Sequence, residues 1–95
     1  MRVIWTPEAV DDRLVIWDYI ATDNPQAAAR MDELFSEATA KLADFPMRGR
    51  PGLIPGTREL FPHESYRLVY EIEGDTVWIL TLIHTARRWP PVDPR

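Results

Sequence analysis

The chain of 95 residues carries eleven Lys and Arg against fifteen Asp and Glu, and its formal net charge of −4 argues against a domain that coats nucleic acid through broad phosphate contact. Its length predicts a single domain over residues 1–95, and its lack of a long apolar run or a signal-peptide pattern predicts a cytoplasmic protein without membrane contact. The absence of cysteine and the presence of two histidines exclude disulfides, thiolate catalysis and Cys- or His-rich metal sites, so neither a metal nor a cofactor is expected.

The N-terminal half is expected to form a strand followed by two helices. Residues 2–5 are short and β-prone, which favours a first strand. Thr6 is a suitable N-cap and is followed by proline, so the first helix is predicted over residues 7 to about 21. Asn24 repeats this start signal, and the second helix is predicted over residues 25 to about 43. Because the linker is so short, the two helices are expected to return antiparallel as a hairpin.

The first helix has an apolar arc of roughly 160°, wider than one packed neighbour needs. One flank is expected to face the core, while the flank with Val10, Leu14 and Trp17 is left over for a partner, a homodimer contact or a broader core. Arg13 falls inside the arc and has no explanation there. The second helix has a narrower stripe that is expected to be core and consists of Ala27, Ala28, Met31, Leu34, Phe35, Ala38 and Leu42.

The C-terminal half is expected to be a long loop followed by strands. The segment 44–57 is rich in Pro and Gly, and both a functional loop and a solvated connector fit it. Strands are predicted over residues 57–61, ending at Pro62, and over residues 66–73 and 76–84, with a two-residue turn between the last two. The order β-α-α-β-β-β predicts an α+β fold, in which the helical hairpin packs on one face of an antiparallel sheet of about four strands.

The two-residue turn predicts a register for the last two strands, with Val69 opposite Leu80. This register places Arg67 and His84 on one face as diagonal neighbours, whose side chains are expected to converge on one ligand. Two simpler interpretations stay open, namely an ion pair of Arg67 with a nearby glutamate such as Glu59 and a hydrogen-bonded His84 at a strand end. The face expected to point toward the helices consists of Tyr66, Leu68, Tyr70, Ile72, Val77, Ile79, Thr81 and Ile83.

Arginines gather near the predicted strand ends of the C-terminal half. Arg58 lies at the start of one strand, Arg48 and Arg50 lie in the loop before it, and Arg87, Arg88 and Trp89 follow the last strand. The first 47 residues carry nine acids and four bases (−5), and the remaining 48 carry six acids and seven bases (+1). A positive patch at one end of the sheet is therefore expected, with a solvated C-terminal segment as the alternative.

Several stretches together resemble the RelE/ParE superfamily of type II toxin–antitoxin toxins. These are TPEA (6–9), IWDYIA (16–21), NPQAA (24–28), FP (45–46), GRP (49–51), GTREL (56–60), YRLVY (66–70) and HTAR (84–87). The resemblance covers nearly the whole chain and implies a compact sheet with a helical hairpin. It also implies a toxin that a cognate antitoxin neutralises by wrapping it in a hetero-oligomer. The flank with Val10, Leu14 and Trp17 is then the expected antitoxin-binding surface.

The resemblance allows two activities. ParE-like members inhibit DNA gyrase by binding, whereas RelE-like members cut mRNA on the ribosome, which for this chain implies catalytic roles for Arg67, His84 and Arg87. The acidic pI of about 5.0 and the helical motifs favour the gyrase inhibitor without catalysis, and a degenerate, non-toxic antitoxin-binding module is a third possibility. The residues expected to contact the target are Arg58, Arg67, His84, Arg87, Arg88 and Trp89.

Overall fold

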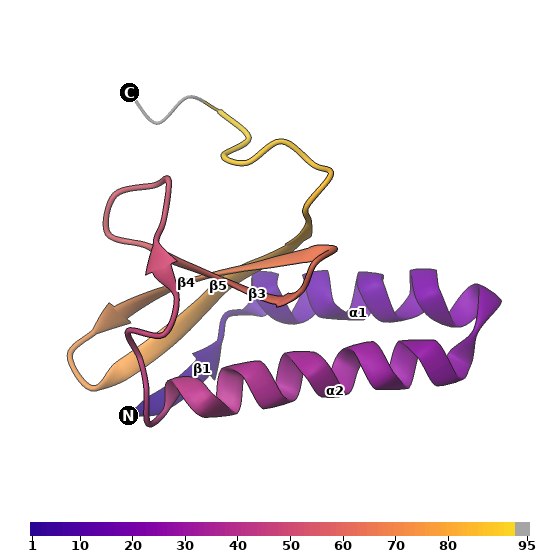
Figure 1. Cartoon of the computed structure of the whole chain (residues 1–95), viewed down its shortest axis with the longest axis horizontal. Helices are drawn as coiled ribbons and strands as arrows, with labels where there is room; N and C mark the ends of the chain where they lie inside the picture. Colours follow the sequence, from indigo (N-terminus) through magenta and orange to yellow (C-terminus); the bar gives the residue numbers. More distant parts are fainter. Residues whose placement is uncertain (93–95) are drawn as a thin grey trace.

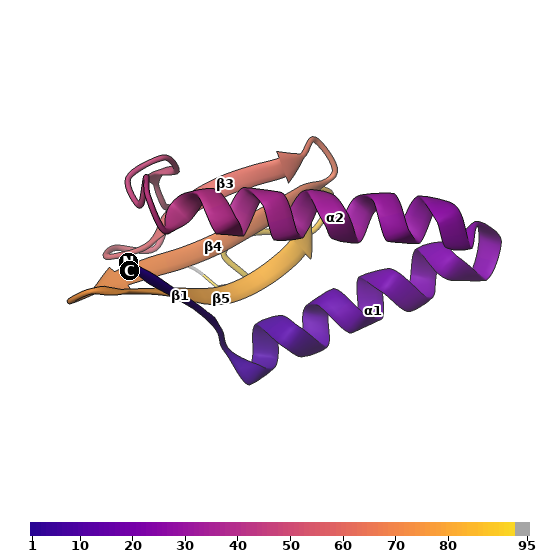
Figure 2. The ribbon, with the colours of Figure 1, turned by 90° about the horizontal axis from the view of Figure 1, so that it is seen from below.

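Two helices pack side by side against one face of a five-stranded sheet (Figures 1 and 2). The computed structural model describes residues 1–92, so the last three residues of the predicted domain lie outside the described range. The sheet order is β1-β5-β4-β3-β2, and all neighbours are antiparallel except β1 and β5, which are parallel. The elements are β1 (Arg2–Trp5), α1 (Pro7–Asp23), α2 (Pro25–Leu42), β2 (Arg50–Pro51), β3 (Arg58–His63), β4 (Tyr66–Glu73) and β5 (Thr76–His84).

The α+β class and the helical hairpin are confirmed, and the helices start where their capping signals predict. The Thr6 hydroxyl accepts the Ala9 N–H at 3.2 Å, and the Asn24 side chain accepts the Ala27 N–H at 3.0 Å. Each cap satisfies one of the amides that a helix N-terminus leaves unpaired, and proline follows it in both cases. Within residues 1–92, no helix is long and apolar enough to cross a membrane.

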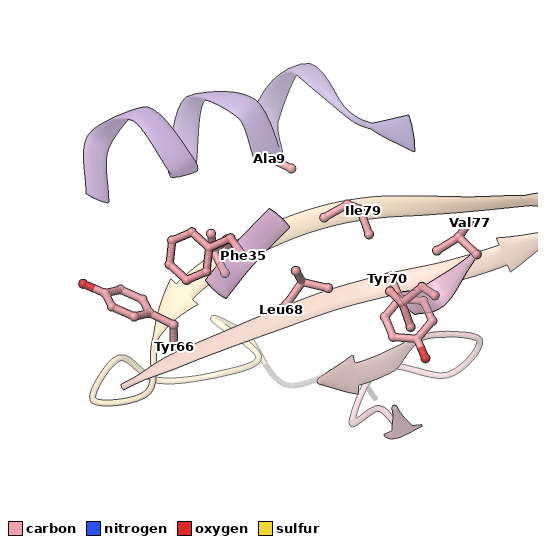
Figure 3. Packing of buried hydrophobic residues seen from close by; sticks show 9 residues of the cluster. Ala9, Phe35, Tyr66, Leu68, Tyr70, Val77 and Ile79 are labelled. Carbon is pink, nitrogen blue, oxygen red and sulfur yellow. The ribbon is translucent and has the colours of Figure 1, made fainter. Parts of the chain in front are cut away.

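The core lies between the hairpin and the sheet (Figure 3). Phe35 of α2 meets Tyr66 of β4 edge-to-face, with ring centroids 5.5 Å apart. Leu34, predicted to belong to the buried stripe of α2, is instead partly exposed. The buried cluster consists of Ala9, Phe35, Leu42, Tyr66, Leu68, Tyr70, Val77, Ile79 and Leu82.

Arg13, unexplained by the helical pattern, connects the two helices. Its Nε and Nη2 atoms donate to the two carboxylate oxygens of Asp32 in α2, at 2.5 and 2.9 Å. The same guanidinium lies 4.8 Å from the ring centroid of Trp5 in β1. A bidentate ion pair therefore interrupts the apolar arc of α1 at its boundary with α2.

The segment 44–57 is a loop that contains a two-residue edge strand. Arg50 and Pro51 of β2 pair with Glu59 and Arg58 of β3, which adds a fifth strand to the four expected. The prediction that Pro62 ends the preceding strand is wrong, because β3 continues to His63. The register shifts between Leu60 and His63, and such an irregularity accommodates a residue without an N–H.

A bulge divides the hairpin of β4 and β5. The predicted register holds from the turn as far as the pair Tyr70–Ile79, after which Val69 pairs with Thr81 rather than Leu80. The extra residue shifts all later pairs by one, so His84 lies opposite Tyr66. Because a one-residue shift reverses the faces, Leu82 enters the core in place of the predicted Thr81 and Ile83.

Candidate functional site

Arg67 and His84 lie on opposite faces of the sheet, so the prediction that they converge on one ligand is wrong. Arg67 alternates with the core residue Leu68 and points to the outer face, away from the helices. His84 pairs with Tyr66 and packs edge-to-face on its ring at 5.3 Å, on the helical side. The bulge causes the difference, because without it His84 would share the face of Arg67.

A buried carboxylate organises the outer face near Arg67. Glu59 of β3 is fully buried, and its Oε2 accepts the Leu53 N–H at 2.9 Å. Its Oε1 lies 3.5 Å from Arg67 Nε and 3.6 Å from Arg50 Nη2. The ion pair of Arg67 with a nearby glutamate, one of the simpler interpretations, is therefore present. Both guanidiniums also lie against the ring of Phe61, at 5.0 Å for Arg50 and 5.4 Å for Arg67.

Arg58 binds its own chain rather than open solvent. Its Nε donates to the Gly49 carbonyl at 2.9 Å, and its Nη2 donates to the Met47 carbonyl at 3.2 Å. Tyr70 of β4, which pairs with Arg58, fixes the same loop. The Tyr70 hydroxyl donates to Pro46 O at 2.7 Å and accepts the Gly49 N–H at 2.9 Å. The segment before β3 is therefore an ordered part of the sheet surface. The anchoring role of Tyr70 was not predicted.

A groove of about 870 Å³ runs between α1 and the C-terminal end of β5. The His84 imidazole lines it and accepts the Ala86 N–H on Nδ1 at 3.0 Å, which leaves Nε2 as the free ring nitrogen. Tyr66 also lines it, and burial, reinforced by the nearby Tyr19, raises the pKa of the Tyr66 phenol. The strand-end histidine therefore shares the groove with Tyr19, Tyr66 and Arg87 from the segment after β5.

The predicted positive patch is distributed over both faces of the sheet. Arg58 shares the face of its partner Tyr70, Arg67 lies on the outer face, and Arg87 lines the groove on the helical side. Arg88 is exposed, and Trp89 is half-buried, with its indole N–H buried and without a hydrogen-bond partner. These residues therefore do not form one continuous surface.

Helix α1 exposes two apolar surfaces. Val10, Leu14 and Trp17 are 43%, 57% and 37% exposed, as expected for a flank that the core does not cover. Val15 and Tyr19 form a second exposed pair beside the groove. Their spacing of four residues puts them on one side of the helix, and this spacing is the sequence signal of the second exposed surface.

Comparisons with known proteins agree with this architecture. Y4kP of Sinorhizobium fredii, a candidate toxin, is 41% identical over 96% of this chain and 95% of its own, and toxin RelE2 of Caulobacter vibrioides is 38% identical over 90% and 97%. In a chain of the chromosomal ParDE system from P. aeruginosa, the fold matches with a TM-score of 0.77 at 25% identity, over 88% of this chain and 95% of that one. Residues 3–89 match the family described as ParE toxin of type II toxin–antitoxin system, parDE. The chain belongs to this family of toxins.

Proposed function

We propose that the protein inhibits DNA gyrase by binding it, without catalysis, and that a cognate antitoxin neutralises it. The observation that carries this proposal is the separation of Arg67 from His84. Cleavage of RNA through attack of a 2′-hydroxyl needs a proton-transfer group and a cation around the same phosphate. Of the cations that the resemblance implies for catalysis, Arg67 lies on the opposite face beside the carboxylate of Glu59, so only Arg87 shares the groove with His84. This arrangement supports an activity based on binding, as does the match to the ParE family.

Contact with the target is proposed for the outer face at Arg67 and for the segment after β5. His84, the last residue of β5, is exposed beside this segment, in which Arg87 and Arg88 are also exposed and to which Trp89 belongs. Arg58 acts indirectly in this proposal, because its guanidinium is held by carbonyl groups of the loop.

The antitoxin is proposed to cover the exposed flank of α1. Val10, Leu14 and Trp17 recur at the i, i+4, i+7 spacing that an amphipathic partner segment recognises. They are exposed apolar side chains on one helix, and covering them removes apolar surface from water.

A supercoiling assay with purified gyrase tests the proposal. The toxin is expected to inhibit supercoiling. Neither the wild type nor His84→Ala is expected to cut mRNA on ribosomes. If the wild type spares gyrase but cuts mRNA on ribosomes, and Arg67→Ala or His84→Ala abolishes the cutting, the protein is an endoribonuclease instead. Normal growth during antitoxin-free expression at good soluble yield would indicate a non-toxic module.

A further inference from the structure

Phe61 is an exposed aromatic side chain on the outer face of the sheet, with two guanidinium groups against its ring. It is 40% exposed, and the guanidinium carbons of Arg50 and Arg67 lie 5.0 and 5.4 Å from its ring centroid. Aromatic and arginine side chains are the residues that most often carry the binding energy of protein interfaces. The two guanidiniums come from separate strands, β2 and β4, so the fold assembles this cluster rather than one local sequence motif.

Glu59 lies beneath this cluster and determines its charge. Its side chain has no exposed surface, and Oε1 approaches both guanidiniums at 3.5 and 3.6 Å. Oε1 and Arg67 Nε are nevertheless buried without hydrogen-bond partners. The pairing is therefore electrostatic and loose, and it leaves the donors of Arg50, whose side chain is 62% exposed, open to a ligand, whereas only 15% of the Arg67 side chain is exposed.

We propose that Arg50, Arg67 and Phe61 form a binding site for a carboxylate that neighbours an apolar side chain on a protein target, and that Glu59 sets the selectivity of this site. The inference rests on the proposed function, because it specifies how the outer face recognises the target. A guanidinium fork matches a carboxylate in a bidentate geometry, and the Phe61 ring offers apolar contact beside it.

The charges favour an acidic protein segment over nucleic acid. Two arginines and one buried glutamate leave a local charge of about +1, whereas binding to a phosphate backbone depends on neutralising several phosphates. The neighbouring loop exposes the apolar side chains Met47 and Leu53 and adds only one further exposed cation, Arg48. A single carboxylate beside an apolar side chain matches both properties.

The first test uses gyrase and variants on the protein surface. Arg50→Ala and Phe61→Ala are each expected to raise the concentration needed for half-inhibition at least tenfold. Arg30→Ala is the matched control, because it removes the same charge from exposed α2 and is expected to stay within twofold of the wild type. If the wild type inhibits gyrase and both outer-face variants remain fully potent, the inference fails and the proposed function stands.

The second test does not depend on gyrase. The peptide Ac-Glu-Leu-Asp-Leu-Glu-NH2 is titrated into the ¹⁵N-labelled protein. A saturable shift of the Arg50 Nε–H signal is expected in the wild type and not in Phe61→Ala. No shift, or tighter binding of a single-stranded DNA oligonucleotide than of the peptide, overturns the inference. If the wild type spares gyrase, the proposed function fails and this titration alone decides whether the site exists.

Glu59→Gln tests the selectivity role. Glutamine keeps an oxygen for the Leu53 N–H but raises the local charge from about +1 to about +2. Oligonucleotide binding is expected to strengthen at least fivefold relative to peptide binding, while the urea midpoint shows that the variant remains folded. An unchanged ratio of the two affinities in a folded variant refutes the role of Glu59.

Discussion

Replacing Tyr70 with phenylalanine removes the hydroxyl that fastens the long loop to the sheet. This hydroxyl donates to Pro46 O at 2.7 Å and accepts the Gly49 N–H at 2.9 Å, and the residue is fully buried. Phenylalanine keeps the ring and its packing but leaves the Gly49 amide without a partner. Two hydrogen bonds contribute about 1 kcal/mol each, and a stranded buried donor adds to the loss, so the free energy of unfolding is expected to fall by about 2–3 kcal/mol.

Equilibrium urea unfolding, followed by tryptophan fluorescence, measures this loss. For a chain of this length it corresponds to a decrease in Tm of roughly 10–20 °C. Tyr19→Phe is the matched control, because Tyr19 is 77% exposed and its loss is expected to cost less than about 0.5 kcal/mol. If the two variants unfold at the same urea concentration, the loop is not held by the Tyr70 hydroxyl and the reasoning is refuted.

Three further predictions concern stability. Gly49→Ala is expected to destabilise by about 2 kcal/mol, because a Cβ would lie 2.7 Å from Glu59 O and 2.8 Å from the Tyr70 ring; an unchanged urea midpoint would contradict this. A double-mutant cycle of Arg13→Ala and Asp32→Ala is expected to give a coupling of about 1 kcal/mol for their partly exposed pair, whereas additive losses would show that the pair contributes nothing. Burial raises the pKa of Tyr66 above its usual 10, so above pH 10 unfolding releases a proton and the free energy of unfolding is expected to fall as the pH rises. Urea midpoints measured from about pH 8 to pH 11 should show this decline in the wild type and a smaller one in Tyr66→Phe. Parallel curves for the two proteins would contradict the prediction.

The parts of the fold that were predictable depend on contacts between residues close in sequence. Thr6 and Asn24 cap helices through amides three residues away, so each signal and its effect lie in one short segment. The turn at Gly74 likewise has the positive φ of 60° that glycine tolerates, and the strands on either side have the predicted bounds.

The unpredicted parts depend on residues far apart in the chain. Arg13 is explained only by Asp32 of the other helix, and Arg58 only by carbonyl groups of the loop before it. The candidate site shows the same limit. The sequence identified the residue types that form it, but the face that each side chain occupies depends on a bulge. Alternation of side chains with a period of two assumes an unbroken ladder, so it cannot predict that bulge.

The bulge is stabilised by the start of α1, which takes the place of a strand at this edge of the sheet. Pairing of β1 with β5 ends at Ile79, and beyond it the Thr6 hydroxyl donates to Leu80 O at 3.3 Å. The Asp12 carboxylate then accepts the Leu82 N–H at 3.1 Å and the Thr81 hydroxyl at 2.7 Å. These contacts satisfy the backbone groups that the irregular strand would otherwise leave unpaired. The helix start therefore stabilises the bulge that turns the strand end toward the groove and away from Arg67. The proposed non-catalytic activity depends on that separation.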